Sequence, residues 1–171
     1  EDNILYLDES SFFLLPILRS MWMRIGQQFR ILTSGSWNAS IKVFGALHAY
    51  NAKWTYQIFD RATGANFIKF LETLLCVYPQ GIIYIILDNA TIHKKSLLVQ
   101  AWLRTQPRIQ LLFLPTASPR LNPVEKVWWY AKPKIAANRW YGSLSVLRSK
   151  AISVFSSLTP YQLLRLTKLA G

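Results

Sequence analysis

Short apolar runs of strand length recur along this chain and are separated by polar or turn-forming segments. Residues 3–8 (NILYLD), 82–87 (IIYIIL) and 109–114 (IQLLFL) are almost wholly apolar, which is typical of strands buried on both faces. Residues 28–33 alternate loosely between apolar and polar positions, and residues 41–49 (IKVFGALHA) are rich in β-branched and aromatic side chains. Both of these segments also predict strands.

Apolar positions at helical spacing predict the intervening helices. Residues 66–77 follow this period, and a second helix is expected over residues 93–104. A third helix opens at Asn122 and should break at Pro133, and roughly the last thirty residues predict one or two more. This order predicts a single α/β domain over residues 1–171, with a mixed sheet and parallel pairing in its second half.

The charge balance points to a polyanionic partner. Twenty Lys and Arg residues against eight Asp and Glu residues give a net charge of +12. Nucleic acid is the usual partner of such a chain, although a basic surface that serves only solubility has the same composition. No apolar run reaches the length of a membrane span and no basic amphipathic helix is evident, so no membrane partner is expected.

The cysteine content and the first residues bear on the cellular compartment. Cys76 is the single cysteine, which excludes an internal disulfide and suits a reducing compartment. Its helical, apolar context predicts a small buried side chain. Glu1 and Asp2 stand where a secretory signal would carry basic residues, so a cytoplasmic protein is expected.

Three of the few acidic residues occupy positions suited to chemistry. Asp8 and Asp88 each end an apolar strand, and Glu125 falls in the first turn of a predicted helix. Ligands of open α/β sheets gather at the carboxyl ends of strands. Two acids brought together there repel each other unless a cation lies between them, and Mg²⁺ prefers carboxylate oxygens. The pattern therefore predicts a magnesium site for a phosphate-containing substrate.

Each acid also has a purely structural interpretation. Asp8 and Asp88 could cap turns, as Asp commonly does. Glu125 follows Asn122 as the third residue of a capping box, a role compatible with metal binding. Glu9 adjoins Asp8, but successive strand residues face opposite sides of a sheet, so we do not place both in one site.

The remaining candidates for catalysis are weak. One cysteine with His48 and His93 cannot form a zinc site. His93 lies five residues after Asp88 and either contacts the same substrate or merely begins a helix. The serines lack the context of a Ser-His-Asp triad, and the chain has no Gly-rich phosphate loop.

Three motifs, taken together, resemble a known family. LPTASPRLNPVEKVW at residues 114–128 resembles the segment around the third acid of DDE transposases of the mariner superfamily, especially their bacterial insertion-sequence branch. LDNATIH at residues 87–93 resembles the second-acid motif of that family, and LDES at residues 7–10 resembles the first. FGAL at residues 44–47 is similar to a strand of the same family.

The resemblance extends from residue 5 to about residue 132, and the 36 residues between Asp88 and Glu125 are similar to the family spacing. It implies an RNase H-like fold, a five-stranded mixed sheet flanked by helices. In that fold Asp8 lies on the first strand, beside Asp88 at the end of the fourth. Glu125 arrives on the helix that follows the fifth strand.

The resemblance also implies the activity. Asp8, Asp88 and Glu125 would be the catalytic residues and would hold two Mg²⁺ ions, replaceable by Mn²⁺, for cleavage and strand transfer at transposon ends. The implied partners are double-stranded DNA and a second copy of the chain in a synaptic homodimer, with no small-molecule cofactor. Possible DNA phosphate contacts lie near the motifs: Asn89, His93, Lys94, Arg120, Asn122, Lys126 and Lys132.

Other functions remain open at this point. The same fold could serve a nuclease that hydrolyses without joining, or an inactive DNA-binding remnant of a transposase. A basic structural RNA-binding protein is a further alternative, but it has no reason to bring three acids together. Members of the family carry helix-turn-helix domains before the first acid, so we expect recognition of the element's ends to require segments beyond this sequence.

Overall fold

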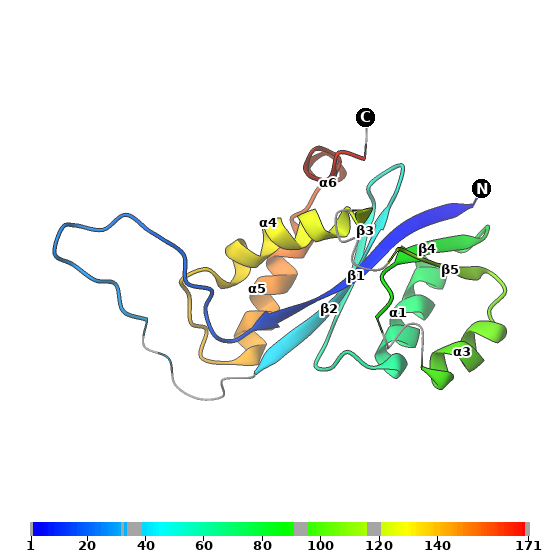
Figure 1. The fold of residues 1–171 in the computed structure, drawn as a ribbon, viewed down its shortest axis with the longest axis horizontal. Coiled ribbons are helices and arrows are strands. Elements are labelled where there is room, and N and C mark those ends of the chain that lie inside the picture. The colour runs from blue at the N-terminus through cyan, green and yellow to red at the C-terminus, as the bar shows by residue number, and fades with distance from the viewer. Residues whose placement is uncertain (1, 32, 34–38, 91–95, 116–120, 170–171) are drawn as a thin grey trace.

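The computed structural model describes residues 2–31, 33, 39–90, 96–115 and 121–169, and within them five strands form one sheet with helices packed against it (Figure 1). The strands are β1 (Asn3–Phe13), β2 (Ser40–His48), β3 (Trp54–Phe59), β4 (Ile83–Leu87) and β5 (Ile109–Phe113). The helices are α1 (Gly64–Val77), α3 (Leu97–Arg104), α4 (Val124–Ala136), α5 (Leu144–Ser156) and α6 (Pro160–Thr167).

The sheet is mixed, with strand order β3-β2-β1-β4-β5. β1 pairs antiparallel with β2 and parallel with β4, and β4 pairs parallel with β5. The parallel pairing expected in the second half of the chain is therefore confirmed. Tyr6 of β1 is level with Ile86 of β4, so the same register extended by two residues brings Asp8 level with Asp88.

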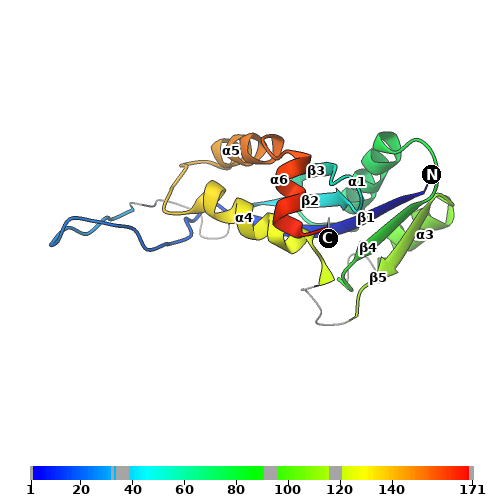
Figure 2. The same ribbon diagram turned by 90° about the horizontal axis from the view of Figure 1, so that it is seen from above.

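The second and third strands differ from the sequence prediction. The described residues of the segment 28–33 are not in a strand, and β3 instead covers residues 54–59. Residues 14–31 follow β1, and we call them the β1–β2 arm. Leu14 and Ile17 at its start pack against the core, and the rest of the arm projects away from the sheet (Figures 1 and 2). A segment that leaves the sheet makes no hydrogen bonds with a neighbouring strand, so the alternation of side chains in residues 28–33 is not enough to make them a strand.

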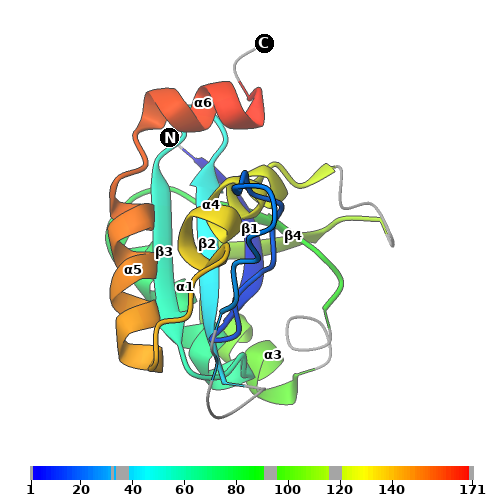
Figure 3. The ribbon, with the colours of Figure 1, turned by 90° about the vertical axis from the view of Figure 1, so that its left-hand side faces the viewer.

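Apolar side chains of β1 alternate between two cores on the two faces of the sheet. Leu5 and Leu7 pack in one core with residues of α1, whereas Phe12 packs in the other with residues of α4 and α5. α4 crosses in front of the strands in Figure 3. Because strand residues alternate, Asp8 faces the α4 side of the sheet and Glu9 faces the α1 side, as predicted.

Two expectations about the helices are wrong. α4 continues through Pro133 to Ala136, because a proline in the last turn removes only one backbone hydrogen bond. Cys76 lies on the exposed side of α1 and is not part of a core. α3 begins at Leu97 with Ser96 as its N-cap, while its predicted start at His93 lies outside the described residues.

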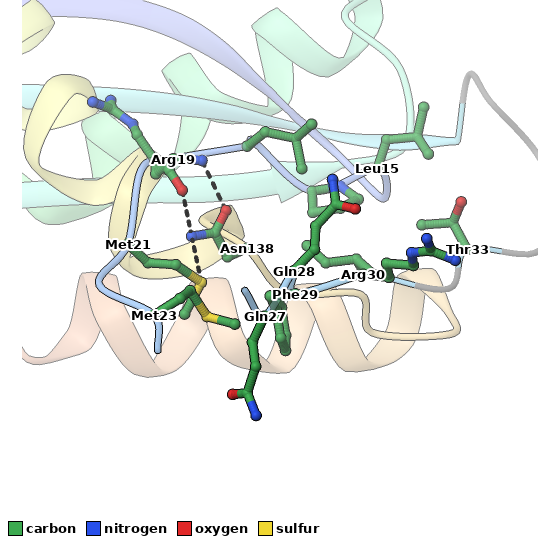
Figure 4. A pocket seen from close by; sticks show the side chains of 13 residues that line it. Leu15, Arg19, Met21, Met23, Gln27, Gln28, Phe29, Arg30, Thr33 and Asn138 are labelled. Carbon is green, nitrogen blue, oxygen red and sulfur yellow. Dashed lines mark hydrogen bonds between the residues drawn. The ribbon is translucent and has the colours of Figure 1, made fainter. Parts of the chain in front are cut away.

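The β1–β2 arm is attached to the end of α4 through Asn138. The side-chain amide of Asn138 accepts a hydrogen bond from the Arg19 backbone N–H (2.7 Å) and donates one to the Arg19 carbonyl (2.8 Å) (Figure 4). The arm borders an open pocket of about 610 Å³ that Asn138, Met21, Met23 and Phe29 help to line. In the described part of the chain, no helix has the length and apolarity needed to cross a bilayer.

Candidate active site

Asp8 lies within β1 on the face of the sheet covered by α4. Its Oδ2 accepts a hydrogen bond of 2.9 Å from the indole Nε1 of Trp128, a residue of α4 that is only 2% exposed. Across the strand pair, Asp8 is opposite Gly45 of β2. The first acid is thus half-buried, and it accepts hydrogen bonds from the Trp128 indole and from the backbone N–H of Glu9.

Asp88 follows the last residue of β4 and is exposed. Its Oδ1 accepts a hydrogen bond from the backbone N–H of Ala90 (3.1 Å), so Asp88 does cap a turn. An ionised carboxylate has two accepting oxygens, so this role is compatible with metal binding. Asn89 donates from Nδ2 to the carbonyl of Leu114 (2.5 Å), which ties the end of β4 to the segment after β5. These contacts fix the backbone that carries the second acid.

Glu125 is an exposed residue in the first turn of α4. The predicted capping box is not formed at the described start of this helix, because its N-cap is Pro123 and lacks a side-chain cap hydrogen bond. Asn122 instead accepts from the N–H of Val124 (3.1 Å) and donates to the carbonyl of Leu7 (2.9 Å). This buried amide connects the start of α4 to the residue before Asp8, and such burial does not fit the DNA contact predicted for it.

The charges of the three acids act on one another. Burial raises the pKa of Asp8 to about 7, and the negative charges of Glu125 and Asp88 add to the effect of burial. The hydrogen bond from Trp128 opposes this rise because it stabilises the ionised carboxylate. Asp8 is therefore within electrostatic reach of both other acids.

The chemistry of this donor set fits a divalent cation, although its spacing is wide. In the described ranges, no three or more carboxylate, imidazole or thiol groups are close enough together to hold a metal ion. Three carboxylates whose charges raise the pKa of the most buried member are nonetheless stabilised by a nearby cation. Binding of an ion would require their side chains to close in on it.

The other predicted DNA contacts are dispersed. Lys126 is exposed and donates from Nζ to the carbonyl of Thr167 (3.1 Å) near the chain's last helix. Lys132 is half-buried and lines a pocket with Phe12 and Phe13, toward the end of β1. Three further predicted contacts lie outside the described residues: His93, Lys94 and Arg120.

Two residues at the site had no predicted role. Trp128 ends the motif at residues 114–128, but nothing in the sequence indicates that its indole N–H contacts Asp8. Gly45 lies in a strand interior, where a glycine often marks the close approach of another group. A glycine within the predicted strand at residues 41–49 therefore indicates that a bulky side chain packs directly against position 45.

The chain is a basic α/β domain with a mixed five-stranded sheet and three carboxylates located on β1, directly after β4 and on α4. Residues 3–148 match the DDE superfamily endonuclease family, and the chain belongs to this family. It is 31% identical over 162 residues to an uncharacterized 39 kDa protein of insertion element IS630 from Shigella sonnei, covering 94% of this chain and 47% of that protein.

Solved transposase structures share the fold. A Mos1 transposase paired-end complex with the left transposon end has a TM-score of 0.71 at 18% identity, covering 97% of this chain and 52% of that one. A Mos1 mariner paired-end complex with Mn has a TM-score of 0.69 at 15% identity, covering 96% and 51%. The fold is RNase H-like, as expected from the resemblance. The chain spans about half the length of these relatives.

Proposed function

We propose that this chain is the catalytic domain of a transposase that cleaves DNA at transposon ends and joins the ends to target DNA, with Asp8, Asp88 and Glu125 as its catalytic residues. The observation that carries this proposal is geometric: the parallel register of β1 with β4 brings Asp8 level with Asp88, and hydrogen bonds from Asn122 and Trp128 hold the start of α4 on β1. The acids lie on β1, after β4 and on α4, and a +12 chain has no other evident reason to concentrate negative charge there.

A divalent metal is part of the proposal. Asp8, Asp88 and Glu125 would hold two Mg²⁺ ions, or Mn²⁺ in their place, which supply an activated hydroxyl nucleophile and stabilise the departing oxygen. Mos1 mariner complexes contain Mn in one structure and Mg in another, which supports the choice of metal. The chain's own contribution is to fix the three carboxylates: β1 and Trp128 orient Asp8, and the turn after β4 presents Asp88.

Double-stranded DNA is the proposed substrate. The net charge of +12 favours binding to a polyanion, and solved Mos1 structures include a transposon end and a strand transfer complex. Lys132, a half-buried residue of α4 four positions after Trp128, stays a proposed phosphate contact, whereas the Asn122 amide is occupied by protein backbone. The expected location is the bacterial cytoplasm, on the nucleoid when DNA is bound.

Asp88→Asn tests the assignment of the second acid. Asparagine retains an oxygen for the Ala90 N–H, so the turn persists while the charge is lost. Cleavage of DNA that carries the element's ends, measured in Mg²⁺ and in Mn²⁺, should fall by roughly 10³-fold or more, since metal-assisted charge stabilisation is worth several kcal/mol. Glu72→Gln, on the exposed side of α1, should leave the rate unchanged.

The same assay separates the alternatives. A rate equal to that of the parent in Asp88→Asn refutes the catalytic role of Asp88. Metal-dependent hydrolysis by the parent without any strand-transfer product indicates a nuclease. DNA binding by the parent without cleavage in either metal indicates an inactive remnant.

We propose further that the protein acts as a homodimer and that the β1–β2 arm contributes to the dimer contact. Trp22 and Ile25 in this arm are fully exposed, at 101% and 105% of their reference areas, and Leu18 is 76% exposed. Clusters of exposed large apolar side chains mark interaction sites, and tryptophan is prominent among residues that dominate binding energy. The arm extends far enough from the sheet to reach another molecule (Figure 2).

Trp22→Ser should weaken self-association. Loss of one central tryptophan costs about 2 kcal/mol or more, which is roughly a 30-fold increase in the dimer dissociation constant. Light scattering and sedimentation, with and without transposon-end DNA, measure this change. Leu97→Ser removes another strongly exposed apolar side chain, at the start of α3, and should have no effect. Equal effects of the two substitutions would contradict the proposed role of the arm.

A further inference from the structure

The hydrogen bond between Trp128 and Asp8 joins two rigidly held groups. The Trp128 ring makes edge contacts with Trp54, Phe12 and Phe155, at centroid distances of 5.4, 6.2 and 5.8 Å. A ring enclosed in this way cannot turn without disturbing its neighbours. The direction of the indole N–H, and with it the orientation of the Asp8 carboxylate, is therefore determined by the core beneath the site.

Gly45 provides the space for this arrangement. It is the cross-strand partner of Asp8, and a Cβ atom added to it would lie 2.7 Å from Cη2 of Trp128 and 2.2 Å from Cη2 of Trp54. Real Cβ atoms do not approach other atoms so closely. The missing side chain at position 45 is thus what allows the indole of Trp128 to lie over the strand pair next to Asp8.

α4 is also held on β1 at its first turn. The Asn122 side chain donates to the carbonyl of Leu7, so hydrogen bonds at Asn122 and Trp128 fasten α4 to two consecutive residues of β1. Glu125 lies between these two attachments, and residues three positions apart on a helix are neighbours on its surface. Trp128 therefore connects the first and third acids through one helix.

We propose that Trp128, held in the hollow left by Gly45, is a positioning residue that orients the carboxylate of Asp8 for binding a divalent cation. This inference rests on the proposed function and assigns a role to a residue outside the three acids. The indole N–H fixes the direction of Oδ2 and has no part in the chemistry itself. Hydrogen bonds of this kind to a metal-binding carboxylate typically contribute about 10- to 100-fold to metal affinity or activity.

Trp128→Phe and Trp54→Phe form a matched pair for the test. Both remove an indole N–H from neighbouring rings, but Nε1 of Trp54 is buried and has no hydrogen-bond partner among the described residues, so its loss deprives none of their carboxylates. Mn²⁺ binding to the full chain, measured by calorimetry, should weaken about 10-fold or more in Trp128→Phe and remain unchanged in Trp54→Phe. An unchanged affinity in Trp128→Phe, or an equal loss in both variants, would overturn the proposal.

An NMR measurement on protein that retains Trp128 distinguishes two outcomes: failure of the positioning role of Trp128, and failure of the proposed metal site. In ¹⁵N-labelled protein, the indole N–H signal of Trp128, identified by its loss in Trp128→Phe, should shift in Asp8→Asn and broaden on addition of Mn²⁺. The Trp54 signal should move less in both experiments. A Trp128 signal insensitive to Asp8→Asn refutes the positioning role. A signal that responds to Asp8→Asn in a chain that binds no Mn²⁺ refutes the metal site instead.

Discussion

Glu125→Gln is expected to lower metal-dependent DNA cleavage by roughly 10³-fold or more while leaving the fold almost as stable as before. Glu125 is exposed, and the start of α4 is held by Asn122, so the carboxylate is not needed to begin the helix. Its charge nevertheless reaches Asp8 and raises the pKa of that residue. Loss of one metal-holding carboxylate removes several kcal/mol of transition-state stabilisation.

Stability measurements distinguish the catalytic role of Glu125 from a capping role. A carboxylate in a first helical turn contributes only about 0.3–1 kcal/mol through the helix dipole, and removal of its repulsion with Asp8 offsets part of that contribution. Denaturant unfolding of Glu125→Gln should therefore differ from the parent by less than about 1 kcal/mol. A clearly destabilised variant that still cleaves DNA would favour the capping role. Glu72→Gln is the matched control on α1.

The strands of the parallel part of the sheet could be predicted because they derive from apolar runs, but the expectation that both are buried on both faces holds only for the central strand β4. β5 is the edge strand, and its Leu112 and Phe113 are exposed. β4 derives from an uninterrupted apolar run and β5 from a run interrupted only by Gln110, and such runs favour a strand over a loop.

β3 is not predicted from the sequence, although Trp54, Tyr56 and Ile58 alternate with other side chains, and a strand is predicted instead at 28–33, where the described residues form none. Only tertiary packing decides between two such alternating segments.

The three acids could be proposed from the sequence because Asp88 follows β4, Glu125 lies in the first turn of α4 and Asp8 follows an apolar run. The expectation that Asp8 ends its strand is wrong, because β1 continues to Phe13. The groups that orient the acids could not be proposed, because their contacts depend on the cross-strand register and on which face of α4 is buried. Asn122 illustrates the difference. Its side chain was expected to cap α4, but it also bonds the carbonyl of Leu7, 115 residues away in sequence.

The negative charge of Asp8 lowers the free energy of unfolding, because burial disfavours a charge on this carboxylate, which also lies near two other acids. The pKa of Asp8 is raised from 3.8 to about 7 by burial and by the neighbouring acids. The unfolded chain therefore releases this proton at lower pH than the folded protein does. In the absence of metal, the free energy of unfolding should accordingly fall as pH rises from about 4 to about 7 and level off above that range.

Asp8→Asn should abolish this dependence and make the metal-free protein more stable at pH 8, by on the order of 2–4 kcal/mol for a shift of this size. Asparagine keeps an oxygen that can accept the hydrogen bond from Trp128, so packing around the site is preserved. Denaturant unfolding of both proteins in EDTA at pH 5 and pH 8 measures the effect, and their difference cancels the other titrating groups. Mg²⁺ should stabilise the parent at pH 8 but have little effect on Asp8→Asn. If the stability of the two proteins depends on pH in the same way, the pKa of Asp8 is not raised in the folded protein. Burial and the neighbouring acids would then not disfavour its negative charge, and this support for the metal site would be lost.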